Sequence, residues 1–168
     1  MASVISDSST LIHLAKIDQL DLLRKFFGKV TIPPAVWLEV VEEGKGRPGA
    51  IGVQTARDAG WIQIQNPTDI RLLQILRSEL DQGEAEALTL ALEIGASLVL
   101  IDESEGRRIA TLYNLPKTGV IGVLIRAKRE GHLQSLRHEL DRLRGEGGFW
   151  IAESLYVRAI ETVGENVV

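Results

Sequence analysis

Short apolar runs alternate with segments of helical periodicity along this chain, and that alternation limits its fold more than any other feature. Val4–Ser6 is one such run, and Ser97–Ile101 ("SLVLI") is another, bounded by Gly95 and Asp102. Apolar runs of this kind are typical of central strands in parallel sheets, which are covered by helices on both faces. We therefore expect an α/β fold built around a central, mostly parallel sheet.

The remaining segments fit this alternation. The segment Thr10–Leu23 is broken near Asp18 and predicts two short helices, and "GKVTIPP" predicts a strand that leads into a helix over 35–43. Prolines are tolerated in the first turn of such a helix. "WIQIQ" alternates apolar and polar residues, which is typical of an edge strand. We expect further helices over 50–59, 83–94, 105–113, 122–129, 133–143 and 153–163, and a short strand in "LPKTG".

Composition narrows the class of protein. The chain has 168 residues, no cysteine and a formal net charge of -4. This length predicts one domain, and the absence of cysteine excludes disulfides, thiolate zinc sites and a cysteine nucleophile. We see no bilayer-spanning apolar run and no signal peptide, so we expect a cytoplasmic protein without a membrane partner. The mildly acidic charge argues against a protein that coats DNA.

Carboxylates follow the two most strand-like runs. Asp7 comes directly after the first, and Asp102 and Glu103 come after "SLVLI". In open α/β sheets, ligands bind outside the carboxyl ends of the strands, so acids at these positions are candidates for a site. Each aspartate could instead cap the helix that follows it. Because both strands end in an acid, we favour a shared site at one edge of the sheet.

Two further acids lie on apolar helical segments. Glu84 begins the stripe of small and apolar residues in "DQGEAEALTLALE", and Glu39 interrupts the apolar run "AVWLEVV". Asp81 and Glu84 have the spacing of a capping box, although Asp81 could cap while Glu84 points inward. Glu39 could simply turn toward solvent. A charge within an apolar run is costly unless it is paired or bound to a metal.

Four acids from separate segments suit a hard divalent cation. Mg²⁺ or Mn²⁺ prefers oxygen ligands and retains several waters. Such ions can activate a water for phosphodiester cleavage. In that arrangement Ser8 and Ser9 would cap the first helix and leave the carboxylate of Asp7 free.

Several segments together resemble the PIN-domain nucleases, which include the VapC-type toxins of prokaryotic toxin–antitoxin systems. The resemblance is greatest to a prokaryotic PIN-like subfamily formerly of unknown function. It spans about residues 3–131 of a single PIN-like domain, leaving about 132–168 as a helical C-terminal extension. The segments, in family order, are "VISDSSTLIHLAKIDQLDLL", "VTIPPAVWLEV", "LDQGEAEALTLALE", "LIDESEGRRIA" and "KTGVIGVLIRAKREG".

The resemblance implies a Rossmann-like three-layer α/β/α fold and metal-dependent cleavage of RNA by an endoribonuclease that uses Mg²⁺ or Mn²⁺. It matches Asp7, Glu39, Glu84 and Asp102 to the catalytic acids, with Asp7, Glu84, Asp102 and Glu103 as metal ligands. The chain departs from many relatives, which carry aspartate at the position of Glu84 and a second aspartate where Glu103 stands. Ser8 and Thr118 match hydroxyl positions near the metal; Thr118 could instead form a simple turn.

Expected partners are RNA, an antitoxin protein and a second copy of the chain. We expect Arg107, Lys117 and Thr118 to contact the RNA phosphates, together with Ser8, although Arg107 could pair with an acid instead. We expect the three histidines to be ordinary packing or surface residues. The aromatic and leucine side chains over 20–27 could form a partner surface or belong to the core.

Two other interpretations stay open at this point. A PIN-like module could bind RNA or a protein without cleaving it. A phosphotransfer domain could use Asp7 as phospho-acceptor, but Ser9 stands where one such class has a second aspartate, and the lysine pattern of another class is missing.

Overall fold

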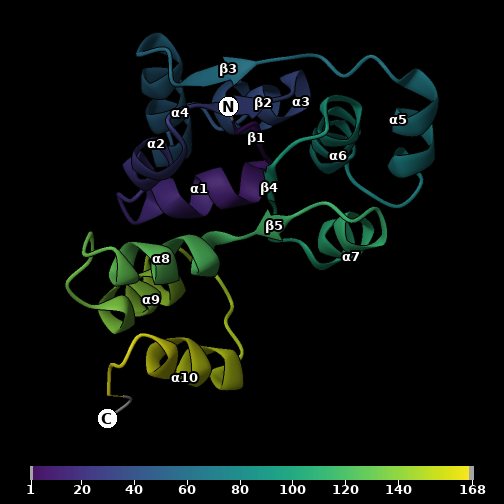
Figure 1. Cartoon of the computed structure of the whole chain (residues 1–168). Coiled ribbons are helices and arrows are strands. Elements are labelled where there is room, and N and C mark those ends of the chain that lie inside the picture. The colour runs from purple at the N-terminus through teal and green to yellow at the C-terminus, as the bar shows by residue number, and fades with distance from the viewer. Residues whose placement is uncertain (1, 167–168) are drawn as a thin grey trace.

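The computed structural model, which describes residues 2–166, contains a five-stranded sheet with the order β3-β2-β1-β4-β5 (Figure 1). Every neighbouring pair of strands is parallel, and β1 lies at the centre between β2 and β4. The expected parallel α/β architecture is therefore confirmed. The strands are β1 (Val4–Ser6), β2 (Val30–Ile32), β3 (Ile62–Ile64), β4 (Leu98–Leu100) and β5 (Lys117–Thr118).

Helices cover both faces of the sheet and make three layers (Figure 1). On one face lie α1 (Ser8–Lys16), α2 (Asp21–Phe27), α4 (Pro48–Asp58) and α8 (Val120–Arg129), with α9 (Leu136–Gly145) and α10 (Glu153–Thr162) beyond α8. On the other face lie α5 (Ile70–Arg77), α6 (Gln82–Ile94) and α7 (Ser104–Leu112). The short helix α3 (Pro34–Trp37) contacts α6, while its buried side chain, Val36, belongs to the core on the first face. None of the described helices is long and apolar enough to cross a membrane.

Side chains alternate between two hydrophobic cores because successive strand residues point to opposite faces. In β1, Val4 packs into the core beneath α1 and α8, while Ile5 packs into the core beneath α6. In β4, Leu100 belongs to the first core and Val99 to the second. The central strands β1 and β4 thus pack on both faces, as their continuous apolar composition predicts.

The helix expected over 35–43 has an unusual second half. It begins as α3 and continues as the π-helix η1 (Leu38–Glu42). Extra residues inserted in this way occur frequently at functional sites, because they rotate the following side chains. Glu39 lies on this wider turn.

The sequence did not predict α5. Asp69 caps this helix by accepting a hydrogen bond from the amide of Leu72 at 3.1 Å, and only Leu76 is fully buried. The helix contacts mainly α6. Of the apolar side chains considered for a partner surface, Leu20 and Leu23 are buried in the core, and Phe26 and Phe27 pack against it.

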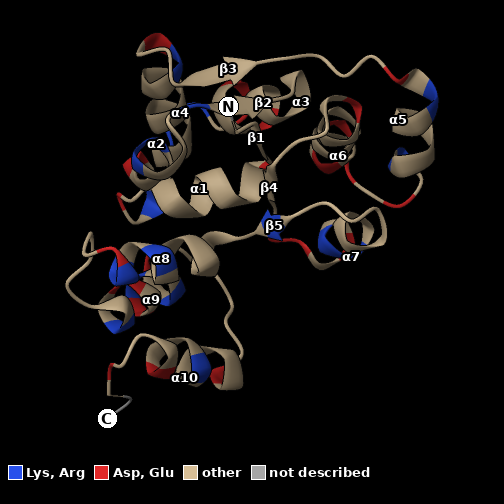
Figure 2. Cartoon of the chain, in the orientation of Figure 1, with Lys and Arg blue, Asp and Glu red and all other residues tan. Residues whose placement is uncertain are grey.

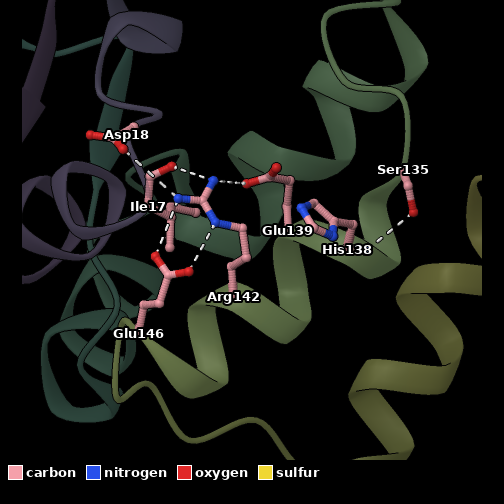
Figure 3. Close-up of polar contacts among 7 residues, drawn as sticks. All are labelled: Ile17, Asp18, Ser135, His138, Glu139, Arg142 and Glu146. Atoms are coloured by element: carbon pink, nitrogen blue, oxygen red, sulfur yellow. Dashed lines mark hydrogen bonds and ion pairs between the residues drawn. The ribbon is translucent and has the colours of Figure 1, made fainter.

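Arg142 of α9 joins the C-terminal helices to the end of α1 (Figure 3). Its Nη1 donates to the carbonyl oxygen of Ile17 at 2.9 Å and to the carboxylate of Glu139 at 3.3 Å. Its Nη2 donates to Glu146 at 3.3 Å. The side chain of Glu139 is only 9% exposed, so Arg142 compensates a nearly buried charge.

Candidate active site

Asp7 lies where β1 ends and α1 begins. One carboxylate oxygen accepts a hydrogen bond from the amide of Thr10 at 3.0 Å, which makes Asp7 the N-cap of α1. The other accepts one from the amide of Asp102 at 3.2 Å. The expectation that Ser8 and Ser9 would cap the helix is wrong, because both serines already lie inside it. Capping and a position at the sheet edge are therefore compatible in Asp7.

Asp102 lies beside Asp7, at the end of the adjacent strand β4. Its carboxylate accepts hydrogen bonds from the hydroxyl of Thr10 at 2.7 Å and from the amide of Val120 at 3.0 Å. Thr10 lies in α1, the helix that follows β1, and Val120 is the first residue of α8, the helix that follows β5. The carboxylate of Asp102, which itself follows β4, therefore connects the segments at the ends of three strands. The two aspartates are neighbours, as the shared strand edge predicts.

Glu84 enters the same region from the first turn of α6. Asp81 caps this helix by accepting a hydrogen bond from the backbone amide of Glu84 at 2.8 Å. The side chain of Glu84 takes no part in this cap. Glu84 is 8% exposed, and its Oε2 has no hydrogen-bond partner among residues 2–166. A buried carboxylate oxygen without a partner is costly, which makes Glu84 a candidate ligand for a cation.

Asp7 and Glu84 line a small cavity of about 90 Å³, which we call the acidic pocket. Glu39 reaches it from η1, although its residue is exposed overall, and Glu103 reaches it from the loop after β4. The Oγ of Ser8 is buried there and has no partner within the described part of the chain. The full lining is Asp7, Ser8, Ser9, Ile12, Glu39, Asp81, Glu84 and Glu103.

Burial makes the ionised acids of this region unfavourable. It raises the pKa of Asp7 to about 7, an effect that the hydrogen bond from Thr10 opposes and the charge of Asp102 reinforces. Burial also raises the pKa of Glu84 to about 8, with the neighbouring carboxyl of Asp81 adding to the shift. The pKa of Asp102 is raised by burial as well. A bound cation would stabilise the ionised form of these carboxyl groups, whose pKa values are raised.

A second and larger cavity, of about 740 Å³, adjoins the acidic pocket, and we call it the large cavity. Asp102 lines this cavity and not the acidic pocket, whereas Glu103 lines both. Arg107, Lys117 and Thr118 also line it, so these three predicted RNA contacts lie together while Ser8 lies in the pocket next door. Basic residues occur on β5 and α7, and acidic residues on α6 (Figure 2).

Close packing of Gly119 against Asp102 gives a test of this geometry. A Cβ at Gly119 would overlap the Oδ1 of Asp102 and come within 3.3 Å of the Nη1 of Arg107. We expect Gly119→Ala to lower the free energy of unfolding by about 1–3 kcal/mol, measured by chemical denaturation. Gly145→Ala is the matched control, because a Cβ there meets nothing within 4 Å. Equal stability of the two variants would contradict the packing described.

Some residues at or near these cavities were not predicted from the sequence as part of the site. His13 lines the large cavity with Asp102, although we expected all three histidines to be ordinary packing or surface residues. Glu86 is buried, and it accepts a hydrogen bond from the amide of Ala35 at 3.1 Å, at the start of α3. Phe149 and Trp150 also line the large cavity. Their signal in the sequence is an aromatic pair directly after two glycines, outside any helical pattern.

Comparison with known families agrees with this arrangement. A family model described as a PIN domain matches residues 3–165. The chain belongs to the PIN-domain family. No curated protein matches it. PIN domains are generally nucleases and typically use divalent metals, and the three-layer parallel fold described above is of this type.

The donor chemistry of this PIN domain suits a hard cation, but its side chains do not form a complete cage. Within residues 2–166 no group of three or more His, Asp and Glu side chains is arranged so that it could hold a metal ion. Mg²⁺ usually needs only one or two carboxylates, because it keeps several waters and binds substrate phosphate. The unpartnered oxygens of Glu84 and Ser8 are oxygen ligands of the kind that Mg²⁺ binds.

Proposed function

We propose that this PIN domain is a Mg²⁺- or Mn²⁺-dependent endoribonuclease that hydrolyses phosphodiester bonds of RNA. The observation that carries the proposal is the acidic pocket, where the unpartnered oxygen of Glu84 lies with Asp7, Glu39 and Glu103 at the carboxyl ends of the strands. The adjoining cavity supplies Arg107 and Lys117 for the phosphates. Carboxylates that could bind a metal cation therefore lie next to cationic side chains that could bind the phosphates of RNA.

Asp7 and Glu84, which line the acidic pocket together, are the residues that would hold the metal. Asp102, in the adjoining cavity, and Glu39 and Glu103 would be further ligands or acceptors for its waters. When bound, Mg²⁺ or Mn²⁺ neutralises phosphate charge and lowers the pKa of a water. Asp7 and Asp102 are fixed for this role by backbone amides and by Thr10, so they need little reorganisation. In this scheme no serine or histidine nucleophile takes part.

The bases on the other side have a separate role. The Nη1 of Arg107 donates to the carbonyl oxygen of Ile101 at 3.0 Å, which holds the guanidinium beside the end of β4. Lys117 and Thr118 follow on the adjacent strand β5. These side chains would orient the RNA backbone across the acids without reading its sequence. Arg107 thus remains available to a phosphate, with one of its donors anchored on the protein.

The test is cleavage of a labelled single-stranded RNA by the purified chain. We expect internal cuts in the presence of Mn²⁺ or Mg²⁺, and no cuts once a chelator removes the metal. Readdition of metal should restore cleavage. Failure of either ion to support cleavage, with the protein folded and RNA intact, would contradict the proposal.

A binding module that does not cleave is the second candidate, and one observation favours it. The carboxylates of Asp7 and Asp102 already accept hydrogen bonds that stabilise the ends of the strands, so they would have a use without a metal. Such a module would bind RNA or a protein equally well with and without chelator. The cleavage assay separates the two candidates directly.

We further propose that the nuclease is the toxin of a type II toxin–antitoxin pair. This proposal follows from the resemblance of the sequence to the VapC-type toxins, which act with an antitoxin protein. Expression of the chain alone should then arrest bacterial growth, and coexpression of the protein encoded by the adjacent reading frame should relieve the arrest. Growth that is unaffected by an active nuclease would contradict the toxin role and leave the nuclease proposal standing.

A further inference from the structure

The large cavity has a wall that the proposed cleavage chemistry does not use. Gly148, Phe149, Trp150 and Ala152, from the segment between α9 and α10, form this wall together with Leu155 of α10. Trp150 in this segment is 82% exposed, the largest value among the exposed large apolar side chains. The chain therefore presents an indole to solvent in a cavity that begins at the proposed catalytic acids.

The other tryptophans of the chain are covered. Trp61 is only 7% exposed, and the guanidinium of Arg57 lies 4.8 Å from the ring centre of Trp37. An uncovered tryptophan in a cavity is unusual, because the indole ring provides much of its favourable energy by leaving water. Trp150 is thus free to pack against a ligand.

Neighbouring contacts hold the segment around Trp150 in place. The amide of Phe149 donates to the carbonyl of Leu143 at 3.0 Å, and the ring of His13 packs edge-on against Phe149 at 4.7 Å. On the other side, Arg144 donates to the carbonyl of Ile151 at 3.0 Å. Since both neighbours of Trp150 are anchored, its backbone is fixed before any ligand arrives.

The lining of the cavity includes both apolar and cationic side chains. Ile121, Ile125 and Phe149 contribute apolar surface along with Trp150, and Arg107 and Lys117 supply positive charge. Neither base forms an ion pair with another described residue. A flat aromatic group joined to an anion fits such a cavity, and a nucleotide is a ligand of that kind. Combining a positive groove with aromatic platforms is how proteins bind single strands.

We propose that the large cavity binds the nucleotide next to the cleaved bond of a single-stranded RNA, with its base stacked on Trp150 and its phosphate at Arg107 and Lys117. This inference rests on the proposed nuclease function, because the acids define which bond is cleaved. Asp102 and Glu103, at the inner end of the cavity, set the direction in which the strand leaves the acidic pocket. Stacking tolerates any base, so this subsite adds affinity with little sequence preference.

The test measures binding, independently of cleavage. A fluorescein-labelled RNA of about six nucleotides is titrated with the protein at low salt and in EDTA, which prevents metal-dependent cutting, and fluorescence anisotropy gives the dissociation constant. We expect Trp150→Ala to weaken binding by about 5- to 100-fold and Trp150→Phe by less than about 3-fold. Quenching of the tryptophan emission by unlabelled RNA should disappear in Trp150→Phe.

Tyr113→Ala is the matched control, since Tyr113 is an exposed aromatic residue at the far end of α7 and does not line the cavity. Its affinity should equal that of the wild-type chain. One abasic position in the RNA should remove the difference between the wild-type chain and Trp150→Ala when it falls at the subsite. An affinity of Trp150→Ala within about 2-fold of wild type, or no binding by the wild-type chain, would overturn the inference.

The two proposals fail in different ways. If the chain binds RNA through Trp150 and metal produces no cleavage, the subsite stands and the nuclease function fails. If metal produces cleavage and Trp150→Ala binds as the wild-type chain does, the nuclease function stands and the subsite fails.

Discussion

Glu84→Gln is expected to lose at least about 100-fold in metal-dependent RNA cleavage, a loss of about 2.7 kcal/mol of transition-state stabilisation, and yet to unfold at a higher temperature than the wild-type protein without metal. Burial raises the pKa of Glu84 from 4.5 to about 8 in the folded protein. The folded state therefore binds this proton more tightly than the unfolded state, and ionisation destabilises the fold. Glutamine has nearly the same shape and no charge to desolvate.

The two pKa values of Glu84 determine how the stability gain of Glu84→Gln varies with pH. Below the ordinary pKa of 4.5, Glu84 is protonated in both states and the variant gains little. As the pH rises from 4.5 to about 8, the unfolded state releases this proton before the folded state does, so the wild-type protein loses stability that the variant keeps. The loss is complete above about pH 8, and a gain of about 1–3 kcal/mol is expected near pH 8.5. Asp7, with a folded pKa of about 7, contributes in the same direction in both proteins. Thermal unfolding in EDTA at several pH values measures the difference.

Glu161→Gln is the matched control for this substitution, because Glu161 is exposed on α10, far along the chain from the acidic pocket. It should change neither cleavage nor the pH dependence of stability. A Glu84→Gln protein that is less stable than wild type near pH 8.5, or that cleaves RNA normally, would contradict the assigned environment of Glu84. The first outcome concerns its burial and the second its role.

Arg142→Met is expected to lower the free energy of unfolding by about 2–4 kcal/mol, because it leaves a nearly buried charge without its partner. The carboxylate of Glu139 is 9% exposed and accepts from Arg142 at 3.3 Å (Figure 3). The carbonyl of Ile17, at the end of α1, also loses its donor. Denaturant unfolding at neutral pH measures the change.

Glu146→Gln is the control from the same cluster. The side chain of Glu146 is 60% exposed, so removing its ion pair with Arg142 should cost no more than about 1 kcal/mol. Adding Glu139→Gln to Arg142→Met should recover part of the loss, because the stranded charge is then gone. If Arg142→Met is as stable as Glu146→Gln, the cluster contributes no more than an ordinary surface ion pair.

The fold could be predicted to a large extent because its central strands, β1 and β4, are buried on both faces. Continuous apolar runs such as "SLVLI" have few other uses in a chain of this composition, and "WIQIQ" shows its edge position through alternation. The helix α5 escaped prediction because only one of its side chains, Leu76, is fully buried. The π-helical turn η1 contacts α4 and α1, and no local pattern in the sequence predicted it.

The candidate site was predicted in its composition and only partly in its arrangement. Strand ends placed Asp7 beside Asp102, and the capping spacing freed Glu84 to point inward. The sequence could not show that Asp102 faces a different cavity from Glu84, since the direction of its carboxylate depends on Thr10 and the amide of Val120. Whether these acids bind metal and catalyse cleavage stays a prediction.

The hydrogen bonds of Asp7 restrict which residues could replace it in related chains. Its two oxygens accept from the amides of Thr10 and Asp102, so asparagine would set a second donor against one of those amides, and glutamate is too long to cap α1 in the same way. Selection for folding alone would therefore retain aspartate at this position, even in a related chain without the proposed nuclease activity. Glu84 makes no comparable hydrogen bond, since its Oε2 contacts no donor among the described residues. If the proposed function holds, loss of the acid at position 84 in a related chain would mark the loss of that activity, whereas retention of Asp7 would be uninformative.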